Sequence, residues 1–302
     1  MIEESFDLQL KKFVSHFTGD SCNFLSEVED EKYPKVSIVM PLYNQVDYVE
    51  RSILSVLNQN YPNLEFILID GGSTDGGVEI IKKYEKYLAY WTSEPDNGQS
   101  DALNKGFKRA TGTIVGWLNG DDLYLPDAIK CAVNELVNRN DKSIVFGDYL
   151  TIDKEDNIMT KEFAFDFSLG QFIYEGFHLN AQAMFWRREA HLRFGQFESD
   201  LHRTMDYDMI LRLGICEGEK SFLRLPITLG CFRRHEAQKT QGYDSVVDAE
   251  HRAIALKNNC DLKYSRWGRW IRLFYRIRRL RWYFKRAGIS YVAAKLFRKV
   301  QK

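Results

Sequence analysis

Cysteine is scarce in this sequence, and its residues are too scattered to form a structural framework. The five cysteines stand at positions 22, 131, 216, 231 and 260, and no two of them form a CxxC pair. An odd number of isolated cysteines argues against a disulfide-rich secreted domain and against a zinc ribbon. We therefore expect a protein of a reducing compartment, for which the cytoplasm is the simplest interpretation.

Long apolar runs are also missing. No segment approaches the roughly 20 consecutive apolar residues that a membrane-spanning helix requires. The first residues, MIEESFDLQLKKF, are acidic and lack the apolar centre of a signal peptide. Both observations agree with the expectation of a cytoplasmic protein.

Two glycine-rich phosphate-binding motifs are absent. The chain contains no GxxxxGK[ST] sequence, and no GxGxxG sequence follows its first apolar segment. A P-loop NTPase and a classical dinucleotide enzyme both lose support for this reason. If the protein binds phosphates, we expect a metal ion rather than a glycine-rich loop to hold them.

The charges balance overall but are divided unevenly along the chain. The sequence has 42 basic and 42 acidic residues, yet residues 261–302 hold 14 of the basic and one of the acidic residues. The tail therefore carries a net charge of +13, and residues 1–260 carry −13. Such a division suggests that the tail has a partner of its own.

Short β-branched segments alternate with segments of helical periodicity in the first half of the chain. This alternation predicts an α/β sheet with helices on both faces. The expected strands are 36–40, 64–69, 87–91 and 113–118, and the expected helices lie within 46–57, 80–84 and 102–110. Beyond residue 143 we expect strands at 144–146, 149–152, 181–186, 222–227 and 229–232, and helices at 207–213, at 243–259 and from 267 onward.

Polar loops follow all four of the first strands. They comprise residues 41–44, 70–75, 94–96 and 119–122, and three of them carry acidic residues. Ligands of α/β sheets bind beyond the carboxyl ends of the strands. Carboxylates gathered there suit Mg²⁺ or Mn²⁺, which commonly bridges a protein to a diphosphate. The alternative for GWLNGDD (residues 116–122) is an ordinary solvated turn.

The order of these motifs resembles family 2 glycosyltransferases of the GT-A fold. The resemblance rests on VSIVMPLYNQVDYVERSILSVLNQNYPNLEFILIDGGSTDG, on SEPDNGQSDALNKGFKRATGTIVGWLNGDD, and on the later segments TMDYDMILRL and CFRRH. It covers about residues 35–240 and implies a mixed, mostly parallel central sheet with flanking helices. We expect an acidic leader (1–34), a nucleotide-binding half (35–125), an acceptor half (126–240) and a helical extension (241–302) that is basic from 261.

The resemblance also implies roles for the residues of the nucleotide side. Asn119, Gly120 and Asp121 occupy the family's DxD position, with Asn in place of the first Asp. Asp121 would then bind Mn²⁺ or Mg²⁺, and Asp122 would support it. The remaining candidates are Pro41, Tyr43 and Asn44 for the base pocket, Asp70 for the nucleobase, Asp96 for the nucleoside and sugar, and His235 for metal or phosphate.

On the acceptor side, Asp206 falls where the family places its catalytic base. His178 and Gln182 are weaker candidates for contact with the acceptor. Each acid also has a structural interpretation, because Asp70 and Asp122 can cap turns or helices. Asp206 can be a carboxylate favoured by the dipole at the start of a helix.

The implied activity is an inverting transfer of a sugar from a nucleotide-diphosphate sugar, with UDP as the favoured nucleotide. The acceptor would be a hydroxyl of a glycan or of a lipid-linked oligosaccharide in the synthesis of a surface polysaccharide. Two alternatives are a sugar-nucleotide nucleotidyltransferase and a non-catalytic binding protein of the same fold.

The basic tail has three interpretations. Arginines interspersed with Trp, Phe, Tyr and Leu are typical of a helix that lies on an anionic membrane surface. Packing on the acidic body is the second interpretation, and binding of nucleic acid is the third and least favoured.

Overall fold

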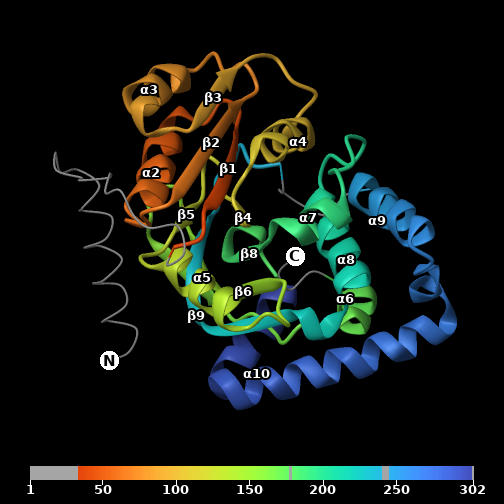
Figure 1. The fold of residues 1–302 in the computed structure, drawn as a ribbon. Coiled ribbons are helices and arrows are strands. Elements are labelled where there is room, and N and C mark those ends of the chain that lie inside the picture. Colours follow the sequence, from red (N-terminus) through yellow and green to blue (C-terminus); the bar gives the residue numbers. More distant parts are fainter. Residues whose placement is uncertain (1–32, 177–178, 240–244, 301–302) are drawn as a thin grey trace.

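The computed structural model describes residues 33–176, 179–239 and 245–300, and it shows a mixed α/β architecture (Figure 1). The N-terminal part of its sheet is parallel, in the order β3-β2-β1-β4. These strands are β1 (Val36–Leu42), β2 (Leu64–Asp70), β3 (Tyr90–Ser93) and β4 (Ile114–Trp117). They alternate with α2 (Val46–Leu57), α3 (Gly77–Tyr84) and α4 (Gln99–Arg109), as the sequence predicted.

The sheet continues beyond β4 in the order β8-β6-β9-β5, and β7 pairs with β6 outside this path. Only β6 and β9 are parallel in this second part. Its strands are β5 (Leu123–Tyr124), β6 (Ile144–Ile152), β7 (Ile158–Glu162), β8 (Met184–Arg187) and β9 (Phe222–Arg233). Its helices are α5 (Ala128–Asn138), α6 (Leu169–Glu175), α7 (Arg188–Phe194) and α8 (Met205–Glu217).

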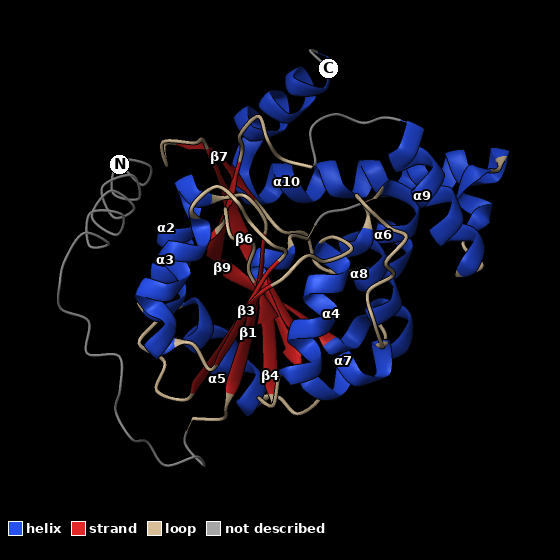
Figure 2. Ribbon diagram, turned by 90° about the horizontal axis from the view of Figure 1, so that it is seen from above, coloured by secondary structure: helices blue, strands red, loops and turns tan. Residues whose placement is uncertain are grey.

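Helices cover both faces of this sheet, which separates two apolar cores (Figure 2). Alternate residues of a strand point to opposite faces, so Val39 belongs to one core while Ile38 and Met40 belong to the other. The first core includes residues of α4, α7 and α8, and the second includes residues of α2, α3 and α5. The predicted α/β architecture is thus confirmed.

Proline interrupts neither β1 nor β9. The sequence predicted that the first strand would end at residue 40, before Pro41, and that the late strands would be divided at residue 228. β4 pairs with β1 only as far as Val39, so Pro41 lies where β1 has no neighbour on that side. In β9, Pro226 falls where the register against β6 shifts between Phe146 and Asp148. An irregularity of this kind accommodates a residue that has no N–H to donate. The predicted strands at 222–227 and 229–232 are therefore one strand.

Other boundaries also differ from the prediction. The segments 144–146 and 149–152 form the single strand β6, which continues through Gly147 although its register against β9 shifts there. The third strand begins at Tyr90 since residues Glu85–Tyr87 form a turn of 3-10 helix. Residues Ala181–Ala183 form a second such turn, so the strand predicted at 181–186 is instead β8 at Met184–Arg187.

The C-terminal extension consists of α9 (Ser245–Lys257) and the long helix α10 (Arg266–Val300). In Figure 1, α10 runs along the lower side of the molecule, beside α6. Gly288 breaks α10 with φ 82° and ψ 178°, a conformation that is essentially restricted to glycine. Among the described residues, no helix combines the length and the apolar character needed to cross a membrane.

Candidate active site

The four polar loops that the sequence placed at the carboxyl ends of the strands meet at one cleft of about 630 Å³. Its walls include residues from each loop and from the segment that follows β9. The predicted site residues that line it are Pro41, Tyr43, Asn44, Asp96, Asn119, Asp121 and His235. The predicted residues that do not line it are Asp70, Gly120, Asp122, Gln182 and Asp206.

Asp70 lies fully buried behind the wall of the cleft and organises the loop after β2. Its carboxylate accepts hydrogen bonds from the backbone N–H groups of Gly72 (3.1 Å) and Ser73 (2.9 Å) and from both the Ser73 and Ser93 hydroxyls. Ser73 in turn accepts a hydrogen bond from the backbone N–H of Asn44 (2.8 Å). The carboxylate therefore fixes the backbone of the loops that form the pocket.

Gly120 allows the loop after β4 to approach α2 closely. A Cβ at this position would lie 2.4 Å from Leu42 Cδ1 and 2.6 Å from Gln45 Oε1. The close approach lets the Ser52 hydroxyl donate a 2.8 Å hydrogen bond to the Gly120 carbonyl. Gly120, the second glycine of the GWLNGDD stretch, is thus required by packing.

The side chain of Asn119 is engaged entirely by protein groups. Its oxygen accepts hydrogen bonds from Trp117 Nε1 (2.5 Å) and Gln99 Nε2 (2.7 Å), and its nitrogen donates to Asp122 Oδ2 (3.0 Å). An oxygen with two donors is not available as a metal ligand in this arrangement. Asn at the first DxD position therefore braces the loop and orients Asp122.

Asp122 is buried beneath the loop, where it accepts a hydrogen bond from the backbone N–H of Arg233 (2.9 Å). Burial, together with the charge of neighbouring Asp121, raises the pKa of Asp122 well above its usual range. Arg233 itself is fully buried, and its Nε donates to the Asp121 carbonyl at 2.7 Å. The arginine also forms a 2.5 Å ion pair with Asp156. Arg233 thus ties β9 to the loop that carries Asp121.

Asp121 and His235 face each other across the cleft floor. His235 Nε2 lies 2.9 Å from Asp121 Oδ2, and its ring stacks tilted against Tyr48 at 4.6 Å between centroids. Within the described ranges, no group of three His, Cys, Asp or Glu side chains is assembled as a metal site. Mg²⁺ and related cations need few protein ligands when phosphate oxygens and water complete the shell. The Asp121–His235 pair therefore fits a cation that is shared with a diphosphate.

Lys239 brings a positive charge into the cleft opposite Asp96, and the sequence reasoning missed it. Its ammonium lies 4.0 Å from the Cβ position of Gly98. Burial lowers the pKa of Lys239 and raises the pKa of Asp96, while attraction between the two opposes both shifts. The backbone N–H of Gly98 donates to Asp96 at 2.7 Å. In the sequence, Lys239 lies four positions after His235, just beyond the CFRRH segment that carries the family resemblance.

Asp206 stands in the first turn of α8, half-buried and outside the lining of the cleft. The backbone N–H of Tyr207 donates to its Oδ1 at 2.8 Å. Burial raises the pKa of Asp206 to about 6, and the charge of Glu250 adds to this shift. The preceding residue Met205 accepts a hydrogen bond from Ser100 of α4 (3.1 Å), so Asp206 is anchored near the helix that borders the cleft. Its carboxyl group is poised to accept a proton near neutral pH.

The acceptor-side candidates are only partly placed. Gln182 is buried in the short helical turn before β8, and its backbone N–H donates to Asn180 Oδ1 at 3.0 Å. His178 lies outside the described residues.

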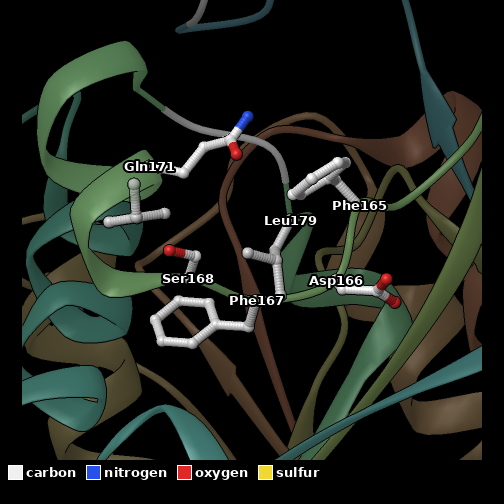
Figure 3. Close-up of a pocket in the computed structure, with 7 residues that line it drawn as sticks. Phe165, Asp166, Phe167, Ser168, Gln171 and Leu179 are labelled. Atoms are coloured by element: carbon white, nitrogen blue, oxygen red, sulfur yellow. The ribbon is translucent and has the colours of Figure 1, made fainter. Parts of the chain in front are cut away.

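A second cavity lies between α6 and residues 165–168, the segment before it (Figure 3). Its volume of about 10 Å³ is close to the minimum that one water molecule occupies. It is lined mainly by aromatic and aliphatic side chains, with Ser168 and Gln171 at its margin (Figure 3). A space of this size cannot accept a sugar or a nucleotide.

Comparison with protein families identifies the family to which the chain belongs. The sequence profile of glycosyl transferase family 2 matches residues 37–194. An uncharacterised glycosyltransferase from Mycobacterium tuberculosis is 31% identical over 201 residues, which are 66% of this chain and 73% of the relative. One from Rickettsia typhi is 33% identical over 189 residues, covering 58% of this chain and 57% of the relative.

Solved structures share the fold. TarS residues 1–349 from S. aureus in complex with UDP-GlcNAc matches with a TM-score of 0.61 and 18% identity, covering 74% of this chain and 66% of that one. The mannosyltransferase PcManGT from Pyrobaculum calidifontis, in complex with GDP-Man and Mn²⁺, matches with a TM-score of 0.55 and 18% identity over 98% of this chain and 87% of that one. From its sequence match and its sheet, the chain belongs to glycosyltransferase family 2 and has the GT-A fold.

Proposed function

We propose that this glycosyltransferase transfers a sugar from a nucleotide-diphosphate sugar to a hydroxyl group, with inversion at the anomeric carbon. The observation that carries the proposal is the cleft, in which the strand-end loops with Asp96 and Asp121 meet the segment after β9 with His235 and Lys239. The DxD-like loop and the cationic Lys239 suit the diphosphate, and the wall formed by Pro41 and its neighbours suits the base. Residues 35–125 would supply the nucleotide side and residues 126–240 the acceptor side.

We favour UDP as the nucleotide of the donor. The acceptor would be a glycan or a lipid-linked oligosaccharide of a surface polysaccharide, and the reaction would take place in the cytoplasm. TarS is described in complexes with UDP and UDP-GlcNAc, which supports UDP, whereas PcManGT is described with GDP-Man. Because the two neighbours hold different nucleotides, the base is a matter for direct measurement.

Asp206 would accept the proton of the acceptor hydroxyl as that oxygen bonds to the anomeric carbon. The bond from the anomeric carbon to the diphosphate breaks in the same step, on the opposite face of the sugar. The raised pKa of Asp206, about 6, gives a carboxylate that is ionised at neutral pH but more basic than an ordinary one. Asp121 and His235 would hold Mn²⁺ or Mg²⁺, which neutralises negative charge on the leaving diphosphate.

A thermal-shift panel tests the nucleotide site. UDP, GDP, dTDP and CDP are each added with and without Mn²⁺ to the parent, to Asp121→Ala and to the control Asp141→Ala, whose side chain is 72% exposed and does not line the cleft. A ligand at 100 times its Kd stabilises a fold by about 2.7 kcal/mol. We expect one nucleotide, UDP, to raise the Tm only with Mn²⁺ in the parent and in the control, and not in Asp121→Ala.

Absence of a shift with every nucleotide would refute the assignment of the cleft. A Mn²⁺-dependent shift that survives Asp121→Ala would refute the role of Asp121 while leaving the cleft as the nucleotide site.

A further inference from the structure

The two sides of α10 have opposite environments. One side packs on the body of the protein: Tyr283 is 6% exposed, and Arg279 forms a 2.6 Å ion pair with the buried Glu175. Arg286 on the same side lies 3.8 Å from Asp148 and donates to the Pro226 carbonyl at 3.3 Å. Residues three and four apart share a face of a helix, so these residues define the packed face.

The opposite side of α10 presents large apolar residues to solvent. Trp267 is 75% exposed, Trp270 is 69% exposed and Phe274 is 62% exposed, at spacings of three and four residues. Globular proteins rarely leave a contiguous apolar surface of this kind without a partner. We define the outer face of α10 by its exposed apolar residues Trp267, Trp270, Leu273, Phe274, Ile277 and Phe284.

Exposed basic residues border the outer face. The sequence of α10 contains no Asp or Glu, whereas its exposed positions include Arg266, Arg269, Arg276, Arg281 and Lys285. A partner must therefore be apolar at its centre and anionic around it. A second copy of α10 would bring the same positive charges face to face, which disfavours self-association.

We propose that the outer face of α10 docks on the surface of an anionic lipid bilayer. Tryptophan and phenylalanine enter the boundary between headgroups and acyl chains, and arginine and lysine pair with the headgroups. The helix lies in the plane of the membrane, because within the described chain it lacks the apolar length to span one. This surface is separate from the cleft and does not depend on the nucleotide or on the sugar that the enzyme uses.

Flotation with lipid vesicles tests the proposal on the full-length protein. Vesicles of phosphatidylcholine alone are compared with vesicles of equal parts phosphatidylcholine and phosphatidylglycerol, at low and high NaCl. The double variant Trp270→Glu, Phe274→Glu removes part of the outer face. The matched control, Leu192→Glu with Leu256→Glu, places the same charges at apolar positions that are 62% and 65% exposed on α7 and α9.

We expect the parent and the control to float with anionic vesicles, with binding weakened by NaCl, and the outer-face variant to bind at least about tenfold more weakly. Circular dichroism and the nucleotide-dependent Tm shift should be the same for all three proteins, which separates docking from folding and from the cleft. Three results would overturn the proposal: no binding to anionic vesicles, equal binding to neutral ones, or unchanged binding by the variant. If the protein does not bind vesicles but forms a dimer in light scattering or retains RNA, the surface has another partner. Either property would then have to be lost only in the outer-face variant.

Discussion

Asp70 and Asp206 show how the same side chain is adapted to two purposes. Asp70 is fully buried, but two backbone N–H groups and two serine hydroxyls donate to it. Those donors suit a carboxylate that holds a loop. The Asp206 carboxylate accepts hydrogen bonds from the Tyr207 backbone N–H and from its own, and burial raises its pKa to about 6. A carboxylate with so little compensation is costly to keep ionised, which is typical of a catalytic group.

The raised pKa of Asp206 predicts a stability effect with a definite sign. The folded protein holds this proton more tightly than the unfolded chain, so stability falls as pH rises from about 4 through about 6. Asp206→Asn removes the ionisation and should raise the Tm relative to the parent at pH 7.5, with the difference disappearing below pH 4. Thermal unfolding across this pH range measures it.

The same variant should lose transfer activity by at least about a hundredfold, because a positioned base contributes that much to a proton transfer, and should keep its nucleotide affinity. Asp200→Asn, at an exposed position shortly before α8, is the control and should change neither property. Full activity in Asp206→Asn would disprove the base assignment, and a Tm below that of the parent at pH 7.5 would disprove the pKa argument.

Among the elements, those with strong local patterns were predictable. The β-branched segments of β1, β2 and β4 and the periodic α2 and α4 follow directly from the sequence, and so does the position of their polar loops at one edge. The positions of Arg233, Lys239 and Glu250 around the site were not predictable. Arg233 binds the Asp121 carbonyl across 112 positions of sequence, and no local periodicity encodes a contact of that kind.

Helix α9 reaches the start of α8 through Glu250. This buried carboxylate accepts hydrogen bonds from the backbone N–H groups of His202 (2.8 Å) and Arg203 (3.1 Å) and from the Thr204 hydroxyl (2.9 Å). The extension beyond the nucleotide-binding region thus shapes the loop that leads into Asp206. Its negative charge also contributes to the raised pKa of Asp206.

Glu250→Gln should therefore move the acidic limb of the pH profile to lower pH, because it removes a charge that raises the pKa of Asp206. It should also cost about 1–3 kcal/mol of stability, since one carboxylate oxygen that accepts from the loop is replaced by an amide nitrogen. The pH dependence of kcat/KM and urea unfolding measure the two effects. Asp248→Asn, at an exposed position on the same helix, is the control. A limb that moves upward, or that stays in place while stability falls, would contradict the electrostatic link between α9 and Asp206.

For the whole molecule, the separation of charge along the sequence becomes a contact between the body and the tail. Three ion pairs join acidic residues of the body to basic residues of α10: Glu175 with Arg279, Asp148 with Arg286 and Glu162 with Lys295. Packing on the acidic body, one of three interpretations of the tail, is thus realised for one face of α10. If the outer face docks on a membrane as proposed, the first two interpretations apply to different sides of one helix.

This division predicts that two neighbouring arginines can be separated by experiment. The Arg279 side chain is 15% exposed and pairs with Glu175, which is 5% exposed, whereas Arg276 is exposed beside the outer face. Arg279→Glu places two carboxylates together at a buried position and should cost about 3 kcal/mol or more, the loss expected when a buried pair is broken. Arg276→Glu should change stability by less than about 0.5 kcal/mol, as exposed substitutions do.

The variant that is more stable to urea, Arg276→Glu, should be the one that binds vesicles more weakly. Under conditions where both are folded, Arg276→Glu should bind anionic vesicles more weakly than Arg279→Glu, because its charge reversal lies next to the docking face. Urea unfolding and vesicle flotation on the same preparations provide both rankings. If Arg279→Glu were as stable as the parent, α10 would not be held to the body by this pair. If both variants lost stability and vesicle binding in parallel, the helix would have a single function, and the separation of its two faces would be wrong.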